Sequence, residues 1–189
     1  MARHLGILAL QGDFAKHAAM LKQLDVAYSL IKKPSDLAPC DGLIIPGGES
    51  TTMTILMHKY ELYPAVTEFA QNYPVMGTCA GMIMVANQVD DERVDPLHLI
   101  NIKVLRNAYG RQIDSFTTMI ELPFLDDPSP FQAVFIRAPQ IETTGEGVMI
   151  LLHWQDQPIM VRNETVLALA FHPELTRDPR IHRYFLENF

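Results

Sequence analysis

The stretch PVMGTCAGM, residues 74–82, is the most informative segment of this chain. Its apolar run ends at Gly77 and predicts a buried strand, and the residues from Ala80 onward predict a helix. Between them Cys79 lies two positions from a glycine on either side, as a nucleophile does on a sharp strand-to-helix turn. A buried packing cysteine is the alternative, because cysteine is among the most buried residue types. The motif alone does not separate the two.

A thiol on such a turn has the surroundings that a nucleophile needs. The glycines leave room for a strained backbone. The N-terminus of the following helix favours a thiolate and presents N–H groups to an oxyanion.

The segments around this turn alternate between apolar runs and helical periodicity. Strands are expected at 5–10, 26–31, 41–48 and 73–77, and helices at 13–24, 51–59 with Ser50 as N-cap, 62–71 and 80–87. Six short strands follow in the second half, in part antiparallel with a hairpin through WQDQP, and a last helix covers 179–188. The pattern predicts an α/β fold, a three-layer sandwich with a mixed, mostly parallel central sheet, flavodoxin-like in its first half. Residues 1–189 are expected to form a single domain.

Composition excludes several classes of protein. Of the 189 residues 48% are hydrophobic and 20% charged, as in a globular protein, and the net charge of −7 with scattered basic residues argues against nucleic acid. The two cysteines have no metal-ligand spacing and fit a reducing cytoplasm. MARHLGILALQGD is expected to be a first strand and not a signal peptide, and no apolar run is long enough to cross a membrane. We expect neither a metal nor a cofactor.

A base for the thiol is expected at His172, in AFHPEL. His172 ends a strand-like run, and the carboxyl ends of parallel strands, where Cys79 also falls, carry the active sites of such sheets. Glu174 lies two residues further and would point the same way in an extended chain, where a carboxylate can orient the imidazole. An ordinary strand end is the alternative. Ordinary surface or packing roles are expected for the other six histidines: His4, His17, His58, His98, His153 and His182.

The segment PGGES, residues 46–50, is the third candidate piece. Gly47 and Gly48 follow a strand and allow a backbone N–H to turn into a cavity, as an oxyanion hole requires. A phosphate loop would need a G-K-[ST] ending, which is missing. A plain tight turn is the alternative.

Six blocks together carry a family resemblance. They are LALQGD, PGGESTTM, GTCAGM, RNAYGRQIDSF, FIRAP and FHPELT, and they run from residue 8 to 176. The chain resembles the triad-type, class I glutamine amidotransferases and, within them, the glutaminase subunits of pyridoxal 5′-phosphate synthase. It departs from the family pattern at GDFAKH and around DERVDPLHL. The loop DDERVDP, residues 90–96, is expected to be a solvated, charged surface.

The resemblance implies a role for each candidate residue. Cys79 would attack the side-chain amide of L-glutamine, the N–H groups of Gly48 and Ala80 would hold the oxyanion, and His172 oriented by Glu174 would transfer protons. The glutamine site would comprise Gly48, Glu49, Ser50, Arg106, Ile136 and Arg137, the two arginines holding the glutamine carboxylate or the loops around it. Gln11 would lie toward a partner and the oxyanion loop.

The partner implied by the resemblance is a separate (β/α)₈-barrel synthase subunit. It would receive the ammonia, build the vitamin B6 ring and switch the glutaminase on. Two other functions stay open: a glutaminase or γ-glutamyl hydrolase of the same fold serving another pathway, and a non-catalytic binding module.

Overall fold

The computed structural model describes residues 3–106 and 115–189. Its helices are α1 (Phe14–Gln23), α2 (Ser50–Lys59), α3 (Leu62–Phe69), α4 (Ala80–Val85) and α5 (Arg180–Asn188), with the 3₁₀ turns η1 (Pro34–Leu37) and η2 (Pro173–Leu175). Its strands are β1 (His4–Leu8), β2 (Ala27–Ile31), β3 (Gly42–Ile45), β4 (Val75–Thr78), β5 (Ala86–Val89), β6 (Ile100–Leu105), β7 (Ser115–Ile120), β8 (Phe131–Ile136), β9 (Gln140–Thr144), β10 (Met149–Trp154), β11 (Gln157–Arg162) and β12 (Val166–Leu169).

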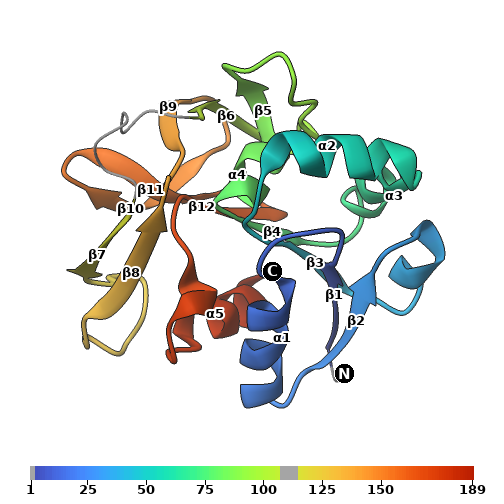
Figure 1. Ribbon diagram of the computed structural model, residues 1–189. Helices are drawn as coiled ribbons and strands as arrows, with labels where there is room; N and C mark the ends of the chain where they lie inside the picture. The colour runs from blue at the N-terminus through green and yellow to red at the C-terminus, as the bar shows by residue number, and fades with distance from the viewer. Residues whose placement is uncertain (1–2, 107–114) are drawn as a thin grey trace.

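A seven-stranded sheet forms the centre of the molecule, in the order β10-β11-β12-β4-β3-β1-β2. The strands β12, β4, β3, β1 and β2 run parallel to one another, whereas β11 pairs antiparallel with both β10 and β12. The mixed, mostly parallel sheet predicted from the sequence is therefore confirmed. In Figure 1, α1 and α5 lie on one side of this sheet and α2, α3 and α4 on the other, which gives the three layers.

The inner strands are apolar because both of their faces are covered. Every residue of β3, β4 and β12 is buried, and the runs GLII, VMGT and VLAL show no alternation of polar and apolar residues. The carboxyl ends of β1, β3, β4 and β12 lie at one edge of the sheet, so the segments that follow them meet there. In the described part of the chain, no helix combines the length and apolar character needed to cross a membrane.

Smaller sheets flank the central one and include two strands that the sequence did not indicate, β5 and β9. We expected a helix over 80–87, but α4 stops at Val85 and β5 pairs with β6, which in turn pairs with β9. The helix is therefore confirmed but ends two residues earlier than expected, because long-range strand pairing overrode the helical pattern at 86–87. β7 and β8 form a separate antiparallel pair.

The expected hairpin through WQDQP is confirmed. Gln155 and Asp156 both have positive φ, at 48° and 64°, as the central residues of a tight hairpin turn do.

Candidate active site

Cys79 lies at the turn between β4 and α4, as the opening motif predicts. Its backbone has φ 51° and ψ −107°, which a residue with a side chain rarely adopts. The Cys79 N–H donates to the Leu169 carbonyl at 2.8 Å, which ties the strained residue to the end of β12. Strain held in this way is typical of a nucleophile elbow.

The flanking glycines are required by close backbone approach. A Cβ on Gly77 would overlap the Gly81 carbonyl, and a Cβ on Gly81 would overlap the Ile45 carbonyl. Glycine at position 77 therefore lets β4 and α4 approach each other, and glycine at position 81 lets α4 pack against β3. This explains the spacing around Cys79.

His172 follows β12 and is held over the thiol from two directions. The backbone N–H of His172 donates to the Val134 carbonyl of β8 at 2.8 Å, and the ring atom Nδ1 lies 2.7 Å from Glu174 Oε1. The predicted pairing is present, but our reason for it was wrong. Pro173 begins the 3₁₀ turn η2, so the curl of that turn, and not an extended chain, brings Glu174 back to His172.

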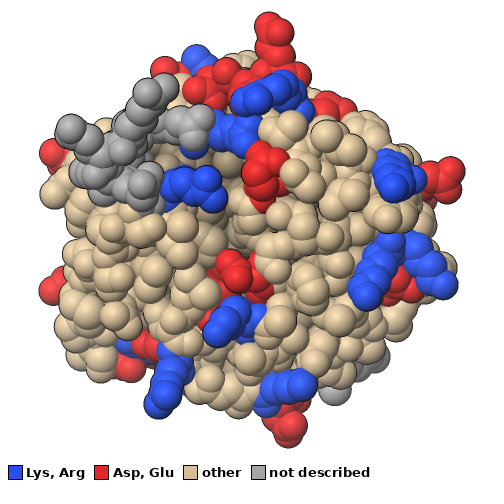
Figure 2. Space-filling model, in the orientation of Figure 1, with Lys and Arg blue, Asp and Glu red and all other residues tan. Residues whose placement is uncertain are grey.

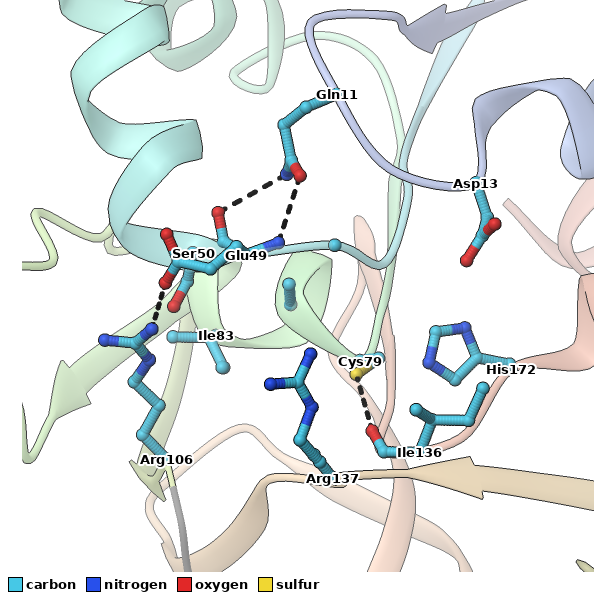
Figure 3. Close-up of a pocket in the computed structure, with 12 residues that line it drawn as sticks. Gln11, Asp13, Glu49, Ser50, Cys79, Ile83, Arg106, Ile136, Arg137 and His172 are labelled. Carbon is cyan, nitrogen blue, oxygen red and sulfur yellow. Dashed lines mark hydrogen bonds and ion pairs between the residues drawn. The ribbon is translucent and has the colours of Figure 1, made fainter. Parts of the chain in front are cut away.

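The electrostatic surroundings of His172 favour its charged form. Burial favours the neutral ring, but hydrogen bonds and charge interactions with Cys79 and Glu174 outweigh it and raise the pKa of His172 to about 10. At neutral pH the ring therefore holds two protons and can act as an acid. When Cys79 carries its proton, Sγ can donate a weak hydrogen bond to the Ile136 carbonyl, at 3.8 Å (Figure 3).

The turn after β3 brings Gly47 and Gly48 against this pair. A Cβ on Gly47 would overlap the ring of His172, so only glycine fits there. Gly48 has φ +155°, and its N–H makes no hydrogen bond with any described residue. Ala80 begins α4, so its N–H has no partner within the helix. Two unpaired N–H groups near the thiol are what an oxyanion hole needs.

Gln11 holds the backbone just after these glycines. Its Oε1 accepts from the Glu49 N–H at 3.0 Å and its Nε2 donates to the Glu49 carbonyl at 3.4 Å, as the dashed lines in Figure 3 show. The side chain from the first strand-to-helix turn therefore supports the glycine turn, toward which the family resemblance implied that it would lie.

Glu49, and not Ser50, is the N-cap of α2. Its carboxylate accepts from the N–H groups of Thr51 at 3.1 Å and Thr52 at 2.7 Å, and it also pairs with Arg106. Desolvation raises the pKa of Glu49, but the hydrogen bonds and the charge of Arg106 outweigh it and lower the pKa to about 2. Our N-cap assignment was wrong because a glutamate one position earlier reaches the same donors.

Arg106 is engaged by protein groups and does not lie free in the site. Besides Glu49, the guanidinium of Arg106 contacts Asp91 at 2.6 Å and Thr51 at 2.7 Å. The backbone N–H of Arg106 donates to the Asp90 carboxylate at 2.8 Å. The expectation that the charges of 90–96 form only a solvated face was thus wrong. Arg106 holds the loops around the site, one of the two roles expected for it.

Every predicted site residue except Glu174 lines one cavity of about 370 Å³ (Figure 3). Its lining comprises Gln11, Asp13, Gly48, Glu49, Ser50, Cys79, Ala80, Ile83, Arg106, Ile136, Arg137 and His172. Arg137 is exposed at φ 42° and has no hydrogen bond or ion pair with a described residue, so its guanidinium is available to a ligand. Glu174 is buried behind His172 and does not line the cavity.

Sequence reasoning missed Asp13 and Ile83. Asp13 falls in GDFAKH, where the chain departs from its family's pattern, and that departure was the available signal. Ile83 lies one helical turn after Cys79. Most of the motif RNAYGRQIDSF lies outside the described residues.

Asp13, His172 and Glu174 form the one group among the described residues that could hold a metal, with ligand atoms within 4.8 Å of one another. The hydrogen bond between His172 and Glu174 already uses the facing nitrogen and oxygen. The arrangement thus needs no ion to account for it.

Charges are spread over the face drawn in Figure 2. Lysines and arginines lie among aspartates and glutamates there and are not gathered into one basic patch.

Comparisons with known proteins agree with this architecture. One solved structure, described as a glutamine amidotransferase, has a TM-score of 0.90 and 43% identity over 97% of both chains. A second, described as a glutamine amidotransferase from Thermotoga maritima, has a TM-score of 0.63 at 14% identity, over 98% of this chain and 83% of that one, and shares the fold alone. The fold is that of the class I glutamine amidotransferases.

The chain belongs to the SNO glutamine amidotransferase family, whose model matches residues 7–189. It is 46% identical over 183 residues to the pyridoxal 5′-phosphate synthase subunit PdxT of Thermosipho africanus, covering 96% of each chain. It is 48% identical over 184 residues to the protein of the same name from Desulforudis audaxviator, covering 97% of each.

Proposed function

We propose that this chain is the glutaminase subunit of a pyridoxal 5′-phosphate synthase. It hydrolyses L-glutamine to glutamate and passes the ammonia to a separate synthase subunit for vitamin B6 synthesis. The names of its relatives, at 46% and 48% identity over nearly whole chains, support the pathway. The observation that carries the chemistry is the strained Cys79 beside a His172–Glu174 pair bonded at 2.7 Å.

In the first half-reaction Cys79 Sγ attacks the side-chain carbonyl carbon of glutamine. The oxyanion that forms is held by the N–H groups of Gly48 and Ala80. His172 delivers a proton to the departing nitrogen, so ammonia leaves and a γ-glutamyl thioester remains on Cys79. The raised pKa of His172 suits this step, because the ring is charged at neutral pH.

In the second half-reaction His172 accepts a proton from water. The hydroxide attacks the thioester, the C–S bond breaks, and glutamate leaves with Cys79 regenerated. Glu174 keeps the ring oriented and stabilises its positive charge in both steps.

The glutamine backbone binds at the mouth of the cavity. Arg137 pairs with its carboxylate, because it is the arginine of the lining that no described residue engages. Glu49, carrying a negative charge, faces the amino group, with Ser50 and Ile136 lining the same cavity. Arg106 contributes by holding Glu49 in place.

The synthase partner binds over the Gln11 turn and the glycine turn that it supports. Both half-reactions proceed through side chains and backbone groups alone and call for no metal or cofactor. Residues 1–189 form one domain, which the single contiguous hydrophobic cluster supports. Two free cysteines suit the reducing cytoplasm where we place the protein.

The test is ammonia release from L-glutamine by the purified chain, with and without the synthase subunit. A γ-glutamyl peptide serves as the competing substrate. Turnover of glutamine coupled to pyridoxal phosphate formation supports the proposal. Turnover of the peptide alone would assign the chain to a γ-glutamyl hydrolase, and turnover of neither substrate would favour a binding module.

A further inference from the structure

Behind the catalytic pair lies a second, fully buried pair of histidines. His17 of α1 and His182 of α5 both have 0% exposure, and His17 Nδ1 lies 2.9 Å from His182 Nε2. The contact joins two helices that lie side by side (Figure 1). Neither residue lines the glutamine cavity, and the proposed mechanism uses neither.

The other nitrogen of His17 faces the catalytic carboxylate. His17 Nε2 lies 3.5 Å from Glu174 Oε2 and 3.2 Å from Thr78 Oγ1. The carboxylate of Glu174 bonds to His172 through Oε1. Its other oxygen, Oε2, is buried and has no hydrogen bond with any described residue. His17 is therefore the group placed to donate to this oxygen, and a buried carboxylate without such a donor is costly.

The hydrogen bonds select one proton arrangement of the pair. If His17 carried its proton on Nδ1, its Nε2 lone pair would face the Glu174 carboxylate, and His182 Nδ1–H would be a buried donor without a partner. With the proton on Nε2, the His17 N–H hydrogen-bonds to Thr78 Oγ1 at 3.2 Å and faces Glu174 Oε2 at 3.5 Å, and Nδ1 accepts from His182 Nε2–H. Within the histidine pair, only an acceptor, His182 Nδ1, is then left unpaired, which costs less than an unpaired donor.

Both rings are neutral at pH 7. Burial, the neighbouring His182 and His172 hold the pKa of His17 well below its usual value, and burial lowers the pKa of His182 to about 4. A neutral pair can keep the assigned proton arrangement throughout turnover.

We propose that His17 is a positioning residue, which donates its Nε2–H to Glu174 and so keeps that carboxylate aimed at His172, while His182 fixes the tautomer of His17. Without a contact at Oε2, Glu174 would be held through Oε1 alone and could rotate that oxygen away from the ring of His172. The role given to Glu174 rests on the proposed glutaminase function. The tautomer of His17 does not.

The surroundings of Glu174 contain further titratable groups. They are His172 and, beyond it, Cys79; Asp13, the N-cap of α1; His17 of α1; and His182 of α5. Lys16 and Arg177 line a surface cavity that reaches Glu174 from outside. A pH profile of activity therefore has to be compared between variants that differ in one donor only.

Two isosteric variants provide that comparison. The amide nitrogen of His17→Gln falls near the position of Nε2 and keeps the donor, whereas that of His17→Asn falls near Nδ1 and loses it. In the complex with the synthase subunit, His17→Asn is expected to lower kcat/KM for glutamine about 10- to 100-fold, the size of one hydrogen bond to a charged group, with little change in KM. The acid limb of its kcat/KM profile should move to higher pH, because activity needs the ionised carboxylate.

His17→Gln should keep the wild-type limb and most of the rate. Equal losses in both variants with an unmoved limb would reduce His17 to a packing residue and overturn the proposal. Wild-type rates in His17→Asn would overturn it as well.

A second measurement needs neither a variant nor activity. Nitrogen-15 NMR of the histidine-labelled full chain at pH 7 should show His17 protonated on Nε2 and not on Nδ1. The Nδ1–H form would overturn the proposal even in an active enzyme. A chain with the Nε2–H form that does not hydrolyse glutamine would refute the glutaminase function and leave the assigned contact intact.

Discussion

At the scale of single residues, the two cysteines are chemically unlike although both are buried. Cys79 contacts His172, whereas Cys40 lies in the loop before β3. Burial together with Asp41 and Asp36 raises the pKa of Cys40 to about 11, so it stays a thiol at neutral pH. Reactivity should therefore separate the two.

Cys79→Ala should abolish ammonia release while leaving the fold unchanged, because the thiol is the attacking group. A glutamine-like electrophile should label Cys79 and spare Cys40, as read by mass spectrometry of peptides. Cys40→Ala is the control and should keep activity. Equal labelling of both thiols would contradict the assignment.

The members of the triad should contribute unequally. His172→Ala removes proton transfer from both half-reactions and is expected to lose activity nearly as fully as Cys79→Ala. Glu174→Ala removes only the orientation of the ring and the stabilisation of its charge, so it should retain measurable turnover. Steady-state kinetics with the synthase present would decide. A glutamate as indispensable as the histidine would have to do more than orient and stabilise the ring.

At the scale of elements, α2 depends on a side chain that also borders the site. Glu49 caps the helix through Thr51 and Thr52 and is held by Arg106. By contrast, the N-cap of α3, Glu61, makes no side-chain capping bond. These two glutamates form a matched pair for mutation.

Glu49→Ala should lower the free energy of unfolding by about 1 kcal/mol, the usual cost of losing an N-cap, and Glu61→Ala should change it little. The pKa of Glu49 is lowered, so its contribution is present above pH 4.5 and lost as the pH falls toward about 2. Urea unfolding at pH 7 measures the difference. Equal effects of the two substitutions would refute the cap.

The contact between α1 and α5 should make the fold sensitive to acid. Both His17 and His182 have lowered pKa values, so their contribution is complete above pH 6.5 and is lost as the pH falls, for His182 through about 4. Between pH 6.5 and about 4, protonation of His182 alone should lower the free energy of unfolding by about 3 kcal/mol.

Thermal or urea unfolding between pH 7 and 4 checks this expectation. The loss of stability should be smaller in His182→Gln, which cannot take up the proton, whereas His58→Gln, at an exposed histidine paired with Asp95, is the control. An unchanged pH dependence in His182→Gln would contradict it.

At the scale of the whole molecule, the glycine turn is suited to a switch. The Gly47 carbonyl accepts from the Asp13 N–H at 3.3 Å, a long hydrogen bond that rotation of the Gly47–Gly48 peptide would break at small cost. Rotation would redirect the Gly48 N–H toward or away from the oxyanion. A partner that binds one orientation preferentially shifts the population to it.

We therefore expect the chain to be a poor glutaminase alone and to be activated by the synthase. One missing oxyanion donor costs about 10² to 10³ in rate, which sets the expected range of activation. The measurement is glutamine turnover across added synthase concentrations. Gln11→Ala, which releases the Glu49 backbone, should weaken the activation. Full activity without synthase would remove the switch from the mechanism.

Short-range patterns in the sequence were enough to predict the parallel α/β core and the position of the reactive turn. These patterns are buried runs such as GLII and VLAL, and glycines two residues either side of Cys79. The residues after neighbouring parallel strands had to meet at one edge, so Cys79, His172 and the Gly47–Gly48 turn could be predicted together.

The side chains that complete these groups became known only from the folded chain. His17 and His182 are 165 residues apart, and Arg106 meets Asp91 and Glu49 from different loops. Nothing local marks such partners, because a histidine in a helix has the same sequence pattern whether its ring meets water or a buried carboxylate. β5 likewise became a strand only where β6 was available to pair with it. Contacts between distant segments carry their energy in packing and desolvation, which arise when the chain has folded.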